Sequence, residues 1–174
     1  MSDNYRKNCF KKILDASSVY DIAIKSPIQF APKLSSKLKN RIYIKREDLQ
    51  PVFSFKLRGA YNKISKIKNP NHIVAASAGN HAQGVALTCK KLKLNSTIVM
   101  PLTTPSIKIN AVKKHGTKII LHGDTYDEAY QYAIKYSKKN NFNFVHPYDD
   151  IDVIAGQGTI GIEILDQLLS LIHI

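Results

Sequence analysis

Lys56 is the residue of this chain best placed to form a covalent bond with a ligand. It lies between Phe55 and Leu57, at the start of an apolar pattern with helical spacing. Burial disfavours an ammonium ion, so a lysine in these surroundings has a lowered pKa, and its neutral amine can form a Schiff base with a carbonyl group. Gly59 leaves space for a bulky group to approach the backbone. The alternative is a lysine that buries only its stem and keeps its charge in water.

The segment Ser77–Gly84, which reads SAGNHAQG, could bind an anion. It lies between an apolar strand pattern and a helical pattern. Small residues at a helix start present free backbone N–H groups and the positive end of the helix dipole to a carboxylate or phosphate, and Asn80 can both donate and accept hydrogen bonds. The alternative is an ordinary turn in which Asn80 or Ser77 caps the helix. His81 has no partner at metal-ligand spacing, so we predict no metal site.

The segment Gly156–Gly161 matches the GxGxxG pattern of dinucleotide-binding loops. It follows the apolar residues 151–155 and precedes a helical pattern over 158–169, which is the setting such a loop needs. However, it comes after several strand–helix units rather than at the first. The acidic ribose ligand, expected about 20 residues later, would lie beyond residue 174. These features argue against a nucleotide site.

Composition limits the function classes that fit this chain. Its 174 residues are 44% hydrophobic, enough to build the core of about one domain. The net charge of +13 would suit nucleic acid, but no basic run exceeds two residues and no aromatics are interleaved for base stacking. Cys9 and Cys89 form no CxxC pair, no apolar run approaches the ~20 residues that span a bilayer, and the start lacks a signal-peptide pattern. We therefore expect a reduced, cytoplasmic protein that binds neither nucleic acid nor membrane.

Strand and helix patterns alternate from residue 41 onward. Such alternation is typical of βαβ units with a mainly parallel sheet, which is an α/β fold. Thr104 is expected to cap a helix that has Pro105 in its first turn. The expected strands are 41–46, 73–76, 96–100, 118–121 and a short one around 144–145. The other helices are expected to include 57–64, 82–92, 129–136 and 158–169.

The first 40 residues carry weaker patterns. A polar helix is expected over residues 5–25, and an irregular stretch is expected after Pro27. The apolar face of this helix would be formed by Phe10, Ile13 and Leu14.

The segment around Lys56 and the segment Ser77–Gly84 occur together, in an order that resembles the motif order of one enzyme family. The motifs are similar in order and spacing to those of the threonine ammonia-lyases (threonine dehydratases), which are fold-type II pyridoxal-phosphate enzymes related to the tryptophan synthase β chain. The resemblance covers residues 19–167, and residues 45–51 (KREDLQP) resemble the biosynthetic form that feeds isoleucine synthesis. The motifs that carry it are Val52–Ala60 (VFSFKLRGA), Ser77–Gly84, Leu121–Gly123 and Ala155–Thr159.

The resemblance implies a role for each residue of these motifs. Lys56 would hold pyridoxal phosphate through a Schiff base and, once released, would remove the Cα proton of L-threonine, so that the products are 2-oxobutanoate and ammonia. Phe55 would stack beside the cofactor, and Asn80 would hydrogen-bond its 3′-oxygen. The substrate carboxylate would be bound by backbone N–H groups of Ser77, Ala78, Gly79, Asn80 and His81.

The resemblance also implies two lobes, of which the larger is incomplete. Residues 1–49 would begin the large cofactor-binding domain, 50–150 would form a small α/β domain, and 151–174 would return to the large domain, with the GxGxxG match as a loop into its next helix. In the family, the loop that binds the cofactor phosphate lies beyond residue 174, so we expect a longer, homo-oligomeric protein to be the active enzyme.

Two alternatives remain open from the sequence. One is a serine dehydratase or serine racemase of the same fold, because serine and threonine differ by one methyl group. The other, from a different class, is a basic nucleic-acid-binding module.

Overall fold

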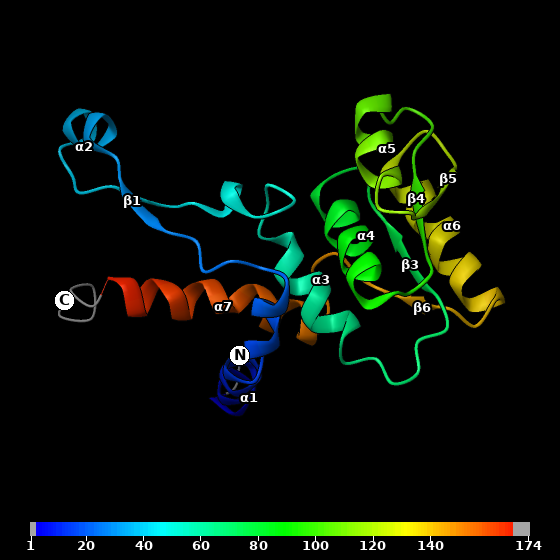
Figure 1. The fold of residues 1–174 in the computed structure, drawn as a ribbon, viewed down its shortest axis with the longest axis horizontal. Coiled ribbons are helices and arrows are strands. Elements are labelled where there is room, and N and C mark those ends of the chain that lie inside the picture. Colours follow the sequence, from blue (N-terminus) through cyan, green and yellow to red (C-terminus); the bar gives the residue numbers. More distant parts are fainter. Residues whose placement is uncertain (1–2, 169–174) are drawn as a thin grey trace.

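The computed structural model, which describes residues 3–168, contains a four-stranded parallel sheet, which lies on the right in Figure 1. Its strands lie in the order β5-β4-β3-β6. The two central strands are buried on both faces, as parallel sheets require: β3 is a continuous apolar run, and β4 begins with the buried hydroxyl residues Ser96 and Thr97. The predicted strands 73–76, 96–100 and 118–121 are confirmed, and the last strand ends at Phe144, one residue earlier than expected. The strands are β3 (Ile73–Ala76), β4 (Ser96–Met100), β5 (Lys118–Leu121) and β6 (Asn143–Phe144).

Helices cover both faces of this sheet (Figure 1). Alternate residues of β3 point into the two layers: Ile73 and Ala75 pack with α4 and α5, whereas Val74 and Ala76 pack with α6. This layering confirms the α/β fold class. The helices are α4 (Asn80–Leu92) and α5 (Ser106–Lys113) on one face and α6 (Tyr126–Lys139) on the other.

Three more helices pack beside the sheet. α3 (Lys56–Ile64) packs against α4 on one side and against α7 (Ile151–Gln167) on the other, and α1 (Asp3–Leu14) packs against α7. α3 thus lies between α4, which covers one face of the sheet, and α7, which follows the sheet in the sequence. Among residues 3–168, no helix is both long enough and apolar enough to cross a membrane.

The GxGxxG segment lies inside α7, so the prediction of a loop at Gly156–Gly161 is wrong. The carboxylate of Asp150 accepts hydrogen bonds from the backbone N–H groups of Asp152 and Val153, which starts the helix five residues before the first glycine. A Cβ at Gly156 would lie 2.4 Å from the carbonyl oxygen of Arg58. The absence of a side chain at Gly156 therefore allows close contact between two helices.

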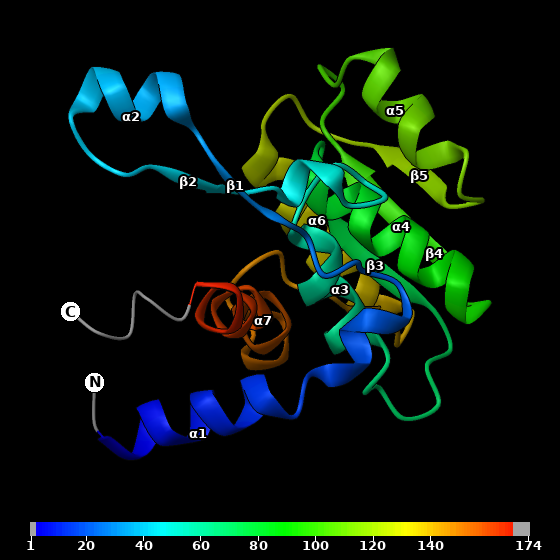
Figure 2. The ribbon, with the colours of Figure 1, turned by 60° about the vertical axis from the view of Figure 1, so that its left-hand side comes forward.

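Residues 27–46 form an arm that extends away from the sheet (Figure 2). It contains β1 (Ile28–Phe30), α2 (Pro32–Leu38) and β2 (Tyr43–Lys45). β1 and β2 are antiparallel, with Ile28 opposite Lys45, so the molecule has a small antiparallel sheet in addition to the parallel one. The prediction of an irregular stretch after Pro27 is wrong, because β1 and α2 occupy most of that segment. The strand predicted at 41–46 is present but shorter, since β2 covers only residues 43–45.

The predicted helix over residues 5–25 ends at Leu14 instead. Ala16 and Val19 are fully buried, so the chain turns into the core and continues as the short 3₁₀ helix Ser17–Asp21. The expected apolar face is also incorrect, because Phe10 and Leu14 are both 53% exposed. A second 3₁₀ helix, Glu47–Leu49, connects the arm to the segment before α3.

Thr104 does not cap a helix, contrary to the prediction. It lies in a turn, with its N–H donating to the carbonyl of Pro101, and α5 begins at Ser106 with Pro105 in the extended N-cap position. The ψ of Pro105 is 141°, which is outside the helical region, so Pro105 itself is the N-cap and the helix begins one residue later than predicted.

Candidate active site

The order of the strands creates a switch point beside β3. The chain continues from β3 to β4 on one side, whereas β6 pairs with the other side of β3. Connections that leave the carboxyl ends of such neighbouring strands diverge, and ligands of open α/β sheets bind in the crevice between them. Here the two connections are residues 77–79 and 145–150.

Lys56 reaches this switch point from the first turn of α3. Its Nζ donates a hydrogen bond of 3.0 Å to the carbonyl oxygen of Pro147, just beyond β6. Burial lowers the pKa of Lys56 from its ordinary value, as the sequence predicted. The ammonium also lies 5.3 Å from the centre of the Phe55 ring. Lys56 is therefore a half-buried amine held against a carbonyl group.

Gly84 brings the second predicted segment against Lys56. A Cβ at Gly84 would lie 3.2 Å from the backbone carbonyl of Lys56. α4 therefore packs directly on the backbone of the first turn of α3. This contact joins two motifs that are separate in sequence.

The start of α4 has backbone donors without side-chain caps. Gly79 is the N-cap residue, and the Oγ of Ser77 accepts a hydrogen bond from the N–H of Gly79 rather than from the first turn. Capping by Asn80 or Ser77 is thus not what the structure shows. Within residues 3–168, the N–H groups of Asn80, His81 and Ala82 have no hydrogen-bond acceptor.

Open space adjoins these donors. A Cβ at Gly79 would meet no atom within 4 Å, and Asn80 is exposed. The Asn80 amide forms no hydrogen bond with any other described residue. A carboxylate or phosphate could therefore reach both the helix N-terminus and the Asn80 amide.

His81 points its side chain at β6 rather than at this space. Its Nε2 lies 3.2 Å from the carbonyl oxygen of Val145, which can only accept, so Nε2 carries the proton. Burial, together with the nearby charges of Lys56 and His146, lowers the pKa of His81 to about 4. Its side chain is a neutral link between α4 and the end of β6, and only its backbone N–H faces the proposed anion site.

Pro147 and His146 are site residues that the motif analysis missed. His146 Nδ1 accepts hydrogen bonds from the N–H groups of Tyr148 and Asp149, which folds this connection back on itself. The turn presents the Pro147 carbonyl to Lys56. The signal that could have located it is its position, directly after the short strand expected around residues 144–145.

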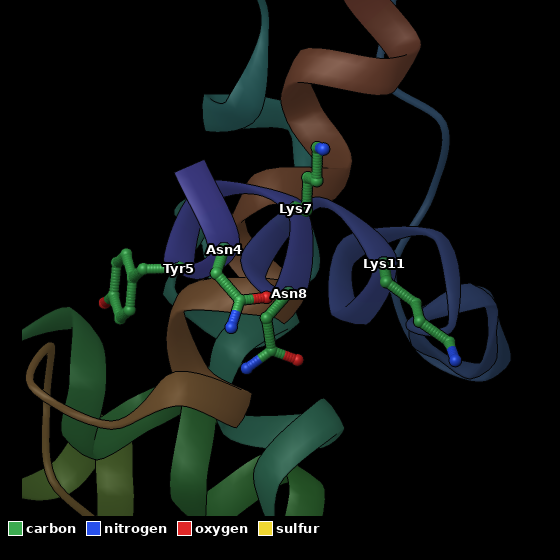
Figure 3. Close-up of a pocket in the computed structure, with 5 residues that line it drawn as sticks. All are labelled: Asn4, Tyr5, Lys7, Asn8 and Lys11. Carbon is green, nitrogen blue, oxygen red and sulfur yellow. The ribbon is translucent and has the colours of Figure 1, made fainter. Parts of the chain in front are cut away.

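A surface hollow on α1 contains none of the predicted residues. It has a volume of about 560 Å³, and Figure 3 shows its side chains spreading in different directions from a single helix, α1. A ligand would be enclosed on one side only. Among residues 3–168, no group of three or more His, Cys, Asp or Glu side chains could hold a metal ion. The hollow is lined by Asn4, Tyr5, Lys7, Asn8 and Lys11.

Comparisons with known proteins identify the family of this chain. The family model described as "Pyridoxal-phosphate dependent enzyme" matches residues 19–173. A threonine dehydratase of Nicotiana attenuata is 58% identical over 156 residues, covering 88% of this chain and 26% of its own length. A biosynthetic L-threonine dehydratase of Burkholderia multivorans is 49% identical over 169 residues, covering 94% of this chain and 33% of its own.

A solved structure shares the fold at similar identity. The processed form of threonine deaminase isoform 2 from Solanum lycopersicum superimposes with a TM-score of 0.88 at 50% identity, covering 93% of this chain and 46% of that one. The chain thus spans a quarter to a third of the two curated relatives and about half of the solved chain. Since the family model matches residues 19–173, which is most of its length, this chain belongs to the pyridoxal-phosphate dependent enzymes.

Proposed function

We propose that this chain is part of a threonine ammonia-lyase, which converts L-threonine to 2-oxobutanoate and ammonia. The observation that carries the proposal is the half-buried amine of Lys56 beside the uncapped N-terminus of α4. The names of the two curated relatives, both threonine dehydratases, support the choice of substrate.

The residues present fit pyridoxal phosphate. Lys56 offers an amine with a lowered pKa for covalent attachment, the Phe55 ring lies beside that amine, and the exposed Asn80 amide is free to hydrogen-bond a ring substituent. When bound, the cofactor supplies an aldehyde and an electron sink for the charge that develops at the substrate Cα.

The chain's own groups bind the substrate and move its proton. The N–H groups at the start of α4 hold the carboxylate of L-threonine, and the backbone of Ser77, Ala78 and Gly79 shapes the same turn. Lys56 in its neutral form accepts the proton from Cα as general base. The Pro147 carbonyl holds Nζ in place before the reaction.

Trapping with borohydride tests the role of Lys56. A protein extended to the length of its relatives is incubated with pyridoxal phosphate and reduced, and the modified lysine is identified by mass spectrometry. The pyridoxyl group should be on Lys56 and should be absent from that peptide in Lys56→Ala. The control is Lys66→Ala, which removes an exposed lysine just beyond the same helix and should leave the labelling of Lys56 unchanged. Label spread evenly over many lysines would contradict the proposal.

Activity decides between threonine and serine. A protein extended to the length of its relatives is assayed for three products: 2-oxobutanoate from L-threonine, pyruvate from L-serine, and D-serine from L-serine. One methyl group is worth only about 1–3 kcal/mol in a pocket, so some activity on serine is expected beside a preference for threonine. A serine dehydratase would prefer serine, and a racemase would form D-serine.

Four broader features are also proposed for the complete protein. It feeds isoleucine synthesis, in line with the biosynthetic name of the Burkholderia relative. It acts in a reducing compartment such as the cytoplasm, since both Cys9 and Cys89 are free thiols. It is a homo-oligomer, and its domains are 1–49 with 151–174 in one lobe and 50–150 in the other.

A further inference from the structure

Arg58, two residues after Lys56, is fully buried and makes five hydrogen bonds. Its Nε and Nη2 donate to the Glu47 carboxylate over 2.9 and 2.8 Å, and its Nη1 donates to Glu163 over 2.6 Å. The remaining two bonds go to Thr159 Oγ1 and to the carbonyl of Ile24. Arg58 therefore connects α3 to α7, to the 3₁₀ helix Glu47–Leu49, and to Ile24, which lies just before the arm of residues 27–46.

A second cation completes a neutral cluster. Lys45 on β2 donates to Glu163 over 2.5 Å, and Tyr20 donates to the other oxygen of the same carboxylate over 2.8 Å. The two cations, Arg58 and Lys45, thus balance the two carboxylates, Glu47 and Glu163. Burial raises the pKa of Glu163, but its hydrogen bonds with Arg58, Lys45 and Tyr20 more than offset this, so its pKa lies below the ordinary value.

Such a cluster is not explained by stability alone. Buried ion pairs are often no more stabilising than apolar side chains of the same volume, because removing the charges from water costs about as much as their attraction returns. Their best-attested advantage is that they define one geometry, which a uniform apolar core does not. The geometry defined here is that of the first turn of α3.

The first turn of α3 also carries Lys56. Residues two positions apart project about 200° from each other around a helix, so Lys56 and Arg58 point to nearly opposite sides. Fixing Arg58 on one side therefore fixes the rotation that directs Lys56 to the other side, where Nζ meets Pro147. The close contact of Gly156 with the Arg58 carbonyl also prevents the two helices from moving closer together.

We propose that the buried cluster of Arg58, Glu47, Glu163 and Lys45 is a positioning device that holds the Lys56 amine at the Pro147 carbonyl. Arg58 and Glu163 are positioning residues and do not touch the ligand. The inference rests on the function proposed above only for the role of Lys56. The two proposals can fail separately, because chemical labelling of Lys56 needs no cofactor whereas borohydride trapping does.

The test is the pH midpoint of Lys56, measured in the 174-residue chain. Lysines are labelled with acetic anhydride over a pH series, and mass spectrometry gives the midpoint of each. The variant is Glu163→Gln, and its matched control is Asp166→Asn, the same change in an exposed ion pair three residues along α7. In Glu163→Gln the Lys56 midpoint should rise by about one pH unit, toward the value of an ordinary lysine, because the amine gains access to water.

The direction of the shift separates positioning from simple electrostatics. Removing a negative charge would by itself lower the pKa of a lysine, so a rise can come only from altered surroundings. An unchanged or lowered Lys56 midpoint in folded Glu163→Gln would overturn the proposal, as would an equal rise in Asp166→Asn. If circular dichroism shows that Glu163→Gln is unfolded, the Lys56 midpoint is measured in Lys45→Met/Glu163→Gln, which removes one charge of each sign. A rise in that midpoint supports the proposal, and an unchanged or lowered midpoint overturns it.

Discussion

Burial acts in the same direction on Lys56 and His81, because it disfavours the charged form of each side chain. For Lys56 the result is an amine that becomes neutral at lower pH than usual, which suits a general base. For His81 the result is an imidazole that stays neutral through the physiological range and holds the end of β6 by its Nε2–H. Burial thus favours the neutral form of both side chains, which makes Lys56 a better base and lets His81 act as a neutral hydrogen-bond donor.

His81 should make the stability of the chain depend on pH. Its pKa is about 4 in the folded protein against 6.5 ordinarily, so the unfolded chain takes up the proton first as the pH falls. The contribution of His81 is fully present above pH 6.5 and should decrease by about 3 kcal/mol as the pH falls to about 4. Urea unfolding at several pH values measures this.

The comparison variant is His81→Gln, whose amide can still donate to Val145 but does not titrate. The difference in unfolding free energy between the parent and this variant should shrink as the pH falls. His122→Gln, at an exposed histidine, should follow the parent at every pH. A constant difference between the parent and His81→Gln would show that His81 does not control this pH dependence.

At the scale of elements, the contact between α3 and α7 decides where the Lys56 amine lies. Gly156 on α7 touches the carbonyl of Arg58, and Gly59 on α3 touches the carbonyl of Val153. Glycines on both helices thus let the backbones approach closely. Of the three glycines in the GxGxxG match, Gly156 packs against α3 and Gly158 against Ile13 of α1, whereas a Cβ at Gly161 would meet no atom within 4 Å; all three lie within α7 rather than in a loop.

Gly156→Ala should destabilise the chain, whereas Gly161→Ala on the same helix should not. A Cβ at position 156 would lie 2.4 Å from a backbone oxygen, and relieving such overlap costs about 1–3 kcal/mol. Gly161 is exposed and a Cβ there meets no atom within 4 Å, so alanine should add about 0.5–1 kcal/mol through its better helix propensity. The free energy of unfolding of both variants is measured with denaturant. Equal changes in the two variants would contradict the close approach of Gly156 to the Arg58 carbonyl.

At the scale of the whole molecule, the net charge of +13 is a property of the surface rather than of the site. The buried cluster around Arg58 is neutral, so it adds nothing to the net charge. Some of the exposed lysines occur in pairs at the ends of helices, such as Lys90–Lys91 and Lys138–Lys139. Cations at the ends of helices are stabilised by the helix dipole, which accounts for their placement without a nucleic-acid partner.

DNA binding by this chain should be weak and should disappear with salt. Fluorescence anisotropy with a short labelled duplex should show binding only at low ionic strength, because dispersed lysines contact few phosphates together. Lys90→Glu/Lys91→Glu should reduce even this binding only slightly, since no single pair dominates. A dissociation constant below about 10⁻⁶ M at physiological salt would instead favour the nucleic-acid-binding module.

The sequence by itself determined the features that depend on short-range pattern. The apolar run at 73–76 and the segment at 96–100 were predicted as strands and are buried strands in the structure, and the neighbours of Lys56 already implied a desolvated amine. The small residues before Asn80 likewise implied a helix start with free N–H groups.

Tertiary structure decided which distant groups meet. Lys56 reaches Pro147, 91 residues away, and Arg58 reaches Glu163, 105 residues away. The glycines of α7 look the same in a phosphate loop as in a helix packed on another helix, and only the presence of α3 separates the two. The physical reason is that local propensity depends on neighbours along the chain, whereas burial, ion pairing and close helix contact depend on whatever the folded chain brings to the other side.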